Sequence, residues 1–264
     1  MITSNLHTHS FYCGHGHGTI SEYVQKGKDL GLKVLGFSEH LPFPNNKLSR
    51  SRMDFSQMSS YESDVLSFKA DKDIKILLGY EADYFENYYD YMSQIKERVE
   101  FLTFGVHYIK TSAGYISPFV DKLGVAELTQ YFNQFKAAME SKLFTFAAHP
   151  DLFYSGYLKW DENAISVSKD MIALSKEYDI PLEINGNGLL KTIRNHQPNY
   201  PYHKFWDLAF EEGARVIVGF DAHEVEDLKN SGDELNKFCS TYNYKYYQSE
   251  LEDNKLVFKK DMGL

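Results

Sequence analysis

Short apolar runs alternate with amphipathic segments along most of this sequence, which predicts seven β-strands, each followed by a helix. The strand-like runs cover residues 2–6, 33–38, 74–79, 101–106, 144–148, 181–184 and 215–219. Helices are expected over 19–31, from 59 onward, and over 89–99, 125–141, 163–178, 203–212 and 226–239. Thr19, three residues before Glu22, and Asp161 are suitable N-caps. Strands and helices in this order form a mainly parallel sheet with helices outside.

Polar residues stand at or just past the carboxyl ends of six of these strands. They are His7, His9, His40, Glu81, His107, His149, Asp221 and His223. A closed barrel gathers such strand ends around one mouth, whereas an open sheet would separate several of them. We therefore expect a distorted (β/α)7 barrel with parallel strands inside, forming a single domain over residues 1–264, because nothing resembles a linker. Residues 41–55 are expected to form a long loop, the Gly- and Asn-rich segment after 184 a turn, and the tail 242–264 has no assigned structure.

The segment 7–18 reads HTHSFYCGHGHG and contains four histidines. An extended backbone directs His7 and His9 to the same side, so both imidazoles can reach one cation. His15 and His17 follow among glycines, which allow the chain to turn back toward the same place. The pattern is typical of a metal site, although His-x-His pairs also occur on surfaces without metal. Cys13 could add a soft ligand, but the nearby nitrogen and oxygen donors suffice, and we expect a spectator role.

The net charge of −9 argues against nucleic acid as a partner, because phosphate backbones are bound by clustered Lys and Arg. No leader sequence and no apolar run of membrane-spanning length is evident, so we expect a soluble, cytoplasmic protein with no membrane partner. Two cysteines far apart in sequence do not indicate a disulfide framework. The sequence leaves the oligomeric state open.

So many imidazoles and carboxylates in one barrel mouth would be costly to bury unless something neutralises and organises them. Divalent cations do so, and no organic cofactor is expected. Mixed nitrogen and oxygen ligands suit Zn, Mn or Fe, and the sequence does not choose among these metals.

Taken together, eight short motifs resemble the polymerase-and-histidinol-phosphatase superfamily, specifically its stand-alone histidinol-phosphate phosphatases, over nearly the whole chain. The motifs are Leu6-His-Thr-His9, Cys13-Gly-His15, Ser38-Glu-His40, Gly79-Tyr-Glu81, Gly105-Val-His107, Ala148-His-Pro150, Glu183-Ile-Asn185 and Gly219-Phe-Asp-Ala-His223. One departure is Glu39, where many relatives have Asp, which leaves its role beside His40 open.

The resemblance implies three divalent metal ions, with the bridging carboxylate of Glu81 offering one oxygen to each of two cations about 3.5–4 Å apart. The implied ligands are His7, His9, Glu81 and Asp221 for the first ion, Glu81, His107 and His149 for the second, and His15, His40 and His223 for the third. The implied reaction is hydrolysis of L-histidinol phosphate to L-histidinol and phosphate, in histidine biosynthesis. We expect a metal-bound hydroxide as the nucleophile, because a phosphate dianion repels free hydroxide.

Substrate-binding residues are sought among the remaining polar groups near the mouth. His17 is the first candidate to bind phosphate or to protonate the leaving group, with a solvent-facing histidine as the alternative. Arg194 is preferred to Lys191 for the phosphate because a guanidinium binds two oxygens at once. Asn185, with Glu183 on the same strand face, could orient ligands or substrate. Arg52 is a weaker candidate, usually explained by a solvated surface.

Three alternatives stay open from the sequence. Another phosphoesterase on the same scaffold could act on phosphotyrosine or on nucleic acid, although the acidic balance disfavours the latter. Amidohydrolases also begin with His-x-His on a barrel but commonly use a carboxylated Lys where this chain has Glu81. A metal-binding protein without turnover is the non-enzymatic alternative.

Overall fold

The computed structural model describes residues 1–46, 48, 51–112, 114–195 and 200–260, and its strands form one curled sheet and a separate hairpin. The sheet contains seven parallel strands that are each followed by a helix. They are β1 (Ser4–Asn5), β2 (Val34–His40), β3 (Lys75–Ala82), β4 (Phe101–Phe104), β7 (Phe146–Ala147), β8 (Leu182–Asn185) and β9 (Val216–Gly219). Each of these seven lies within or overlaps one of the predicted strand-like runs.

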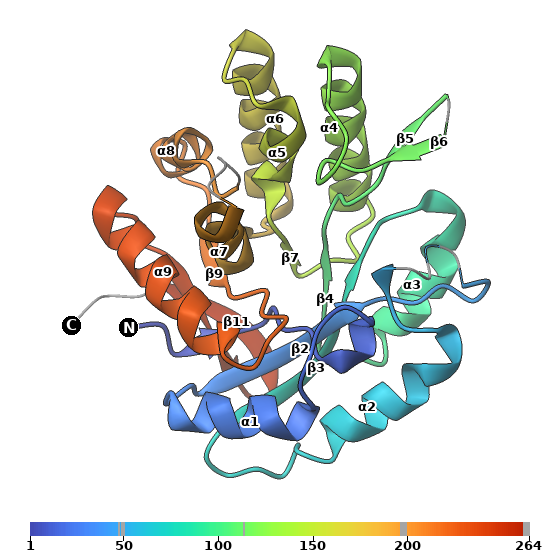
Figure 1. Cartoon of the computed structure of the whole chain (residues 1–264), viewed down its shortest axis with the longest axis vertical. Coiled ribbons are helices and arrows are strands. Elements are labelled where there is room, and N and C mark those ends of the chain that lie inside the picture. Colours follow the sequence, from blue (N-terminus) through green and yellow to red (C-terminus); the bar gives the residue numbers. More distant parts are fainter. Residues whose placement is uncertain (47, 49–50, 113, 196–199, 261–264) are drawn as a thin grey trace.

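The helix that follows each of these seven strands lies outside the sheet, as Figure 1 shows. These helices are α1 (Ile20–Asp29), α2 (Met58–Leu66), α3 (Tyr89–Lys96), α4 (Val125–Glu140), α6 (Glu162–Tyr178), α8 (His203–Glu211) and α9 (Asp227–Tyr242). Thr19 and Glu22 form the expected capping box, and Asp161 accepts the Ala164 N–H at the start of α6. The prediction of a barrel-like α/β fold with parallel strands inside is therefore confirmed. Among the described residues, no helix has both the length and the apolar character needed to cross a membrane.

The curled sheet brings the segment after β1 against the segment after β9. Thr8 pairs with Ala222 in parallel, the Asp221 N–H donates to the His7 carbonyl at 2.8 Å, and the His9 N–H donates to the Ala222 carbonyl at 2.8 Å. This pairing closes the rim at the carboxyl ends of the strands. Polar residues at those ends consequently face one another across a single mouth.

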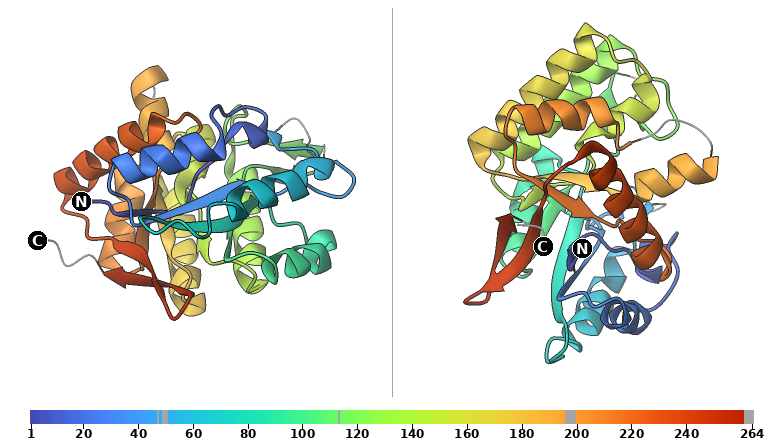
Figure 2. Two further views of the ribbon diagram at one scale, coloured as in Figure 1. Left: turned by 90° about the horizontal axis from the view of Figure 1, so that it is seen from below. Right: turned by 90° about the vertical axis from the view of Figure 1, so that its left-hand side faces the viewer.

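The tail forms a hairpin of β10 (Tyr247–Glu252) and β11 (Lys255–Lys260), whose two red arrows lie side by side in Figure 2. Strand β10 pairs with β9, and the Ser249 N–H donates to Ser4 Oγ at 2.9 Å, so β10 lies between β9 and β1. Four hairpin side chains pack against the inner core of the barrel, namely Tyr247, Leu251, Leu256 and Phe258. The hairpin therefore covers the barrel at the amino ends of its strands.

Two hydrophobic cores support the mouth. The larger fills the space between sheet and helices, and the smaller, which includes Leu77, Phe101 and Phe146, fills the barrel itself. Alternation along β3 places Leu77, Gly79 and Glu81 on the inner face. A Cβ at Gly79 would lie 2.4 Å from the Phe101 ring, so glycine lets that ring fill the interior below Glu81.

The turn expected after β8 is wrong, because Gly186–Asn195 forms helix α7. The Gly188 N–H donates to Asn185 Oδ1 at 3.0 Å, so Asn185 caps this helix. A Cβ at Gly188 would lie 2.2 Å from the Tyr200 carbonyl oxygen, which means that close packing, and not a turn, requires this glycine.

Several short elements interrupt the regular order of strands and helices. They are η1 (Phe11–Cys13), η3 (Phe55–Gln57), η4 (Glu86–Tyr88), β5 (Ile109–Thr111), β6 (Gly114–Ile116), η5 (Pro150–Leu152) and α5 (Phe153–Tyr157). Strands β5 and β6 form a small hairpin after β4. The described residues between 41 and 54 form a loop, as expected.

Candidate metal centre

Four donor atoms converge from three parts of the chain at the mouth. His7 Nε2 lies 3.1 Å from His9 Nε2, 3.3 Å from Glu81 Oε2 and 3.4 Å from Asp221 Oδ1. His9 Nε2 lies 3.4 Å from Glu81 Oε2 and 3.3 Å from Asp221 Oδ1. A tetrahedral cation with ligands at about 2.0–2.1 Å requires donor separations of about 3.3 Å. These five separations are the ones expected between ligands of one tetrahedral cation.

The second oxygen of Glu81 meets a different pair of imidazoles. Glu81 Oε1 lies 2.9 Å from His149 Nε2 and 3.2 Å from His107 Nε2, and these two nitrogens are 3.2 Å apart. The three atoms form a triangle of the size that one face of a tetrahedral site requires. Glu81 thus presents one oxygen to each of two groups, which is the arrangement of a bridging carboxylate.

Glu81 is 1% exposed, and none of the described nitrogens near its Oε2 meets that oxygen with hydrogen-bond geometry. Burial alone would raise the pKa of Glu81, but the imidazoles of His107, His7 and His40 hold it well below its usual range. The carboxylate is therefore ionised. A buried anionic oxygen without a donor is costly, and a cation would satisfy it, so the residues fit a divalent metal.

A third group lies on the other side of His9. His15 Nε2 and His223 Nε2 approach to 3.0 Å, while their Nδ1 atoms each lie 3.0 Å from a backbone carbonyl, that of Cys13 and that of Asp221 respectively. Nδ1–H donation to the carbonyls would leave both Nε2 lone pairs free for a cation.

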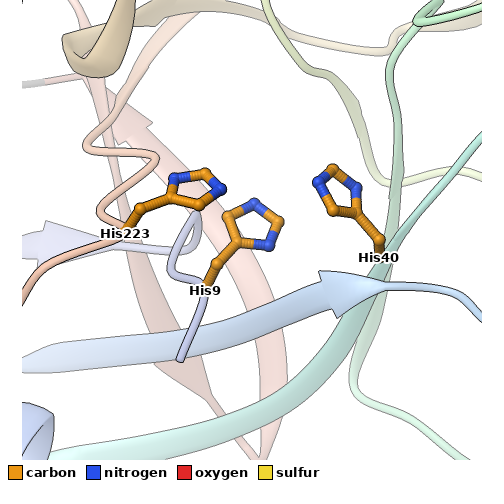
Figure 3. Close-up of side chains that lie close together, drawn as sticks. All are labelled: His9, His40 and His223. Carbon is orange, nitrogen blue, oxygen red and sulfur yellow. The ribbon is translucent and has the colours of Figure 1, made fainter. Parts of the chain in front are cut away.

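His40 is placed differently from the other two members of this predicted set. Its Nδ1 lies 3.1 Å from Glu81 Oε2, and the His9 ring stacks between His40 and His223, with centroid distances of 4.5 and 4.4 Å (Figure 3). Donor atoms of His9, His40 and His223 lie within 4.8 Å of one another. The structure therefore pairs His15 with His223 and turns His40 toward Glu81.

Cys13 lies close to this third group. Its Sγ donates to the Ser10 carbonyl at 3.2 Å and accepts the Gly16 N–H at 3.0 Å, and burial raises the pKa of the thiol to about 12. Its Sγ lies with donor atoms of His15 and His223 in a group within 4.8 Å that could hold a cation, and the spectator role stays a prediction.

Glu183 and Asn185 orient the ligands from below. Glu183 Oε1 lies 2.8 Å from His7 Nδ1, and its Oε2 accepts the His149 N–H at 3.2 Å. Asn185 donates to the same Oε2 at 3.0 Å. Both polar atoms of Asn185 are therefore engaged, one with Glu183 and one in capping α7, and its side chain is not among those lining the cavity.

Two ligand candidates have left-handed backbone conformations. His149 has φ = 31° and Asp221 has φ = 50°. Residues other than glycine rarely adopt a backbone conformation with positive φ. Such strain is of the order of 1–3 kcal/mol per residue and persists where the surrounding contacts enforce it. At both positions it turns a donor atom into the mouth.

A cavity of about 270 Å³ opens above these residues. Its lining comprises His15, His40, Ser51, Arg52, Glu81, His107, Tyr108, Ser117, Phe119, His149, Asn187, Lys191, Asp221 and His223. Lys191 Nζ lies 4.5 Å from the centre of the Phe119 ring, and burial lowers the pKa of this lysine. The lining therefore places a cation next to the metal ligands, in a space that fits a small anionic molecule.

Two predicted substrate residues lie outside the cavity. The His17 side chain is 75% exposed and lies 3.7 Å from Glu224 Oε1, while its backbone N–H donates to the His223 carbonyl. Arg194 Nη2 lies 2.8 Å from Asp227 Oδ1, because α7 packs beside α9. Neither side chain lines the cavity, and their roles at the phosphate and the leaving group stay predictions.

Arg52 was expected to be a solvated surface residue, but the structure buries it at the mouth. It is 4% exposed, lines the cavity and donates through Nη2 to Asp83 Oδ2 at 2.8 Å. Asp83 was missed, although it follows Glu81 at the strand period of two. Asn187 was also missed, because its segment was expected to be a turn; its amide donates to Asp221 Oδ2 at 3.2 Å.

Glu39 lies behind His9. Its Oε1 accepts both the N–H and the hydroxyl of Ser10 at 2.6 Å, and its Oε2 is 3.9 Å from His9 Nδ1. Burial raises the pKa of Glu39 to about 7. The residue that departs from the family pattern is therefore adjacent to a candidate ligand.

Fold and site together define a parallel β/α barrel whose mouth, at the carboxyl ends of the strands, carries donor groups that fit divalent metal. A model of the PHP domain family matches residues 5–187, which is more than half of the chain. The chain belongs to this family.

Relatives and solved structures support the same placement. The chain is 27% identical over 232 residues to a Deinococcus radiodurans protein named "Probable histidinol-phosphatase", covering 84% of this chain and 86% of that protein. It is 21% identical over 255 residues to the histidinol-phosphatase of Bacillus subtilis, covering 84% and 94%. The crystal structure of histidinol phosphate phosphatase from Lactococcus lactis, complexed with Zn, L-histidinol and phosphate, matches with a TM-score of 0.70 at 15% identity, covering 97% of this chain and 98% of that one.

Proposed function

We propose that this protein hydrolyses L-histidinol phosphate to L-histidinol and phosphate in histidine biosynthesis. The observation that carries the proposal is the buried Glu81 carboxylate, whose two oxygens face two different sets of imidazoles. Similarity to three histidinol-phosphatases over most of the chain supports the choice of substrate.

We assign three divalent ions to the centre, with Zn, Mn and Fe as the candidates. The first is held by His7, His9, Glu81 and Asp221, the second by Glu81, His107 and His149, and the third by His15, His40 and His223. When bound, the ions supply a nucleophile at neutral pH and positive charge for the phosphoryl oxygens. The chain itself holds the imidazoles, through Glu183 and the backbone carbonyls, in orientations that leave Nε2 free.

Lys191 is the protein cation that we place on the substrate phosphate. Its ammonium lines the cavity and lies over the Phe119 ring, and no ion pair to Lys191 is found among the described residues. Arg194, by contrast, is already paired with Asp227. Arg194 and His17 remain secondary proposals for the phosphate and the leaving group, and Asn185 for substrate orientation.

Substituting Lys191 with Met is expected to raise the KM for histidinol phosphate by about 10–100-fold, because a charge-assisted contact to the phosphate is worth about 1.5–3 kcal/mol. Arg194→Met is the matched control and should change KM by less than about threefold, the effect expected for an exposed ion pair. Steady-state kinetics on the two variants measure the difference. A larger effect of Arg194→Met would transfer the phosphate role to Arg194.

The substrate is tested by comparing kcat/KM for L-histidinol phosphate, phosphotyrosine and a short oligonucleotide on the metal-replete protein. We expect histidinol phosphate to be preferred by at least about 100-fold, which corresponds to about 2.7 kcal/mol of transition-state binding. Preference for phosphotyrosine or the oligonucleotide would identify another phosphoesterase of the same family. Metal-replete protein that turns over none of the three would favour the non-catalytic alternative.

A further inference from the structure

Asp83 connects a candidate metal ligand to the loop that walls the cavity. It is 1% exposed, and both of its carboxylate oxygens have partners. Oδ1 accepts the backbone N–H of His107 at 3.0 Å and lies 3.3 Å from His107 Nδ1. Oδ2 accepts from Arg52 Nη2 at 2.8 Å. One carboxylate thus contacts His107 at two points and a guanidinium at a third.

The contact leaves His107 Nε2 facing the metal centre. This nitrogen lies 3.2 Å from both Glu81 Oε1 and His149 Nε2. The Nδ1–Oδ1 contact lacks hydrogen-bond geometry, so Asp83 holds His107 through the backbone N–H and faces Nδ1 as a charge. A carboxylate facing Nδ1 favours the ring form with a proton on Nδ1, whose Nε2 lone pair is free for a cation. On the other side of the centre Glu183 makes a shorter contact of the same kind to His7, a hydrogen bond with 2.8 Å between Oε1 and Nδ1. Asp83 therefore lies behind His107 in the second set of candidate ligands as Glu183 lies behind His7 in the first set.

Arg52 fixes Asp83 from the loop side. Its Nη1 donates to the Leu41 carbonyl at 2.8 Å, and its guanidinium lies 5.1 Å from the centre of the Phe43 ring. Leu41 directly follows His40, so one guanidinium joins the start of the loop, its end and the carboxylate behind His107. The neighbouring Ser51 Oγ accepts from the Tyr108 hydroxyl at 3.0 Å, and both side chains line the cavity.

We propose that Asp83 and Arg52 are a positioning pair that holds His107 as a ligand of the second metal and couples this ligand to the cavity wall formed by residues 51–52. The inference rests on the metal assignment proposed above. Neither residue needs to touch the reacting atoms. The pair acts by orienting the His107 ring and by anchoring the loop.

Asp83→Asn tests this most directly, because the amide retains the shape of the carboxylate but loses its charge. Each variant is stripped of metal and titrated with Zn²⁺ in competition with a chromophoric chelator, and its melting temperature is measured without metal. We expect one class of Zn²⁺ site to weaken by about 10–100-fold, as is typical for the loss of a carboxylate behind a ligating histidine, while the other Zn²⁺ affinities are retained. Arg52→Lys changes the other member of the pair and should weaken Zn²⁺ binding at the same class of site by a smaller factor.

Asp227→Asn is the matched control, since Asp227 is a buried carboxylate bound to a guanidinium at the same distance of 2.8 Å but away from the cavity. It should leave every Zn²⁺ affinity unchanged. Wild-type Zn²⁺ affinities in both Asp83→Asn and Arg52→Lys would overturn the proposal, and so would an equal loss in Asp227→Asn. Because the readout is metal affinity, failure of histidinol phosphate as substrate would leave this result interpretable.

Discussion

Glu81→Ala is expected to lower kcat/KM by at least about 10³-fold, because it removes one donor from each of two cation sites. The oxygens of this buried carboxylate lie within 3.4 Å of the Nε2 atoms of both the His7–His9 pair and the His107–His149 pair. Its loss leaves imidazoles without the anion that balances two cations. Steady-state kinetics with saturating Zn²⁺, together with elemental analysis of the same preparation, measure the effect.

Glu81→Gln is the second variant for this prediction, since it keeps the volume of the side chain while replacing the bridging carboxylate. It should be nearly as inactive. Glu97→Ala, at an exposed glutamate on the surface after α3, provides the control and should retain wild-type activity. Near wild-type turnover by Glu81→Ala in metal-replete protein would contradict the bridging role and with it the proposed centre.

Removal of metal is expected to abolish hydrolysis and to lower the melting temperature by about 10 °C. A ligand present at 1,000 times its Kd stabilises the folded state by about 4 kcal/mol, and each kcal/mol is worth about 2–4 °C in a chain of this size. The affected residues are buried: Glu81, His7 and His9 lie in the centre with at most 1% exposure. Chelator treatment followed by calorimetry and a phosphate-release assay would measure both effects.

Readdition of Zn²⁺ should restore both activity and melting temperature in the wild type, and Glu81→Ala should show a clearly smaller thermal response. Protein shown by elemental analysis to be free of metal, yet fully active, would exclude the proposed role of the cations. A thermal response of equal size in the Glu81→Ala variant would place the stabilising metal elsewhere.

The ligand candidates could be predicted because parallel strands impose a simple rule. His7, Glu81, His107, His149 and Asp221 each lie at or just past the end of a strand, and the curvature of the sheet brings these ends to one mouth. The N-cap residues Thr19 and Asp161 could also be predicted from the sequence, because an N-cap contacts residues only three positions away.

The residues around the ligands were harder to predict because their partners are distant in sequence. Arg52 resembles a solvated loop residue until Asp83, 31 positions away, is placed against it. Arg194 was ranked above Lys191 on side-chain geometry alone, because their segment was expected to be a turn. In α7, packing against Tyr200 and α9 determines which of the two cations reaches the cavity.

By itself the sequence determined the seven strand-and-helix units, the parallel barrel and the candidate ligands at the strand ends, since these depend on periodicity and on local hydrogen bonding. The tertiary structure alone decided which nitrogen of each imidazole faces the centre, which cation lines the cavity, and that β10 and β11 cover the barrel from below. Those features depend on contacts between segments remote in sequence, such as His7 with Glu183 and Ser4 with Ser249, and no local pattern encodes them.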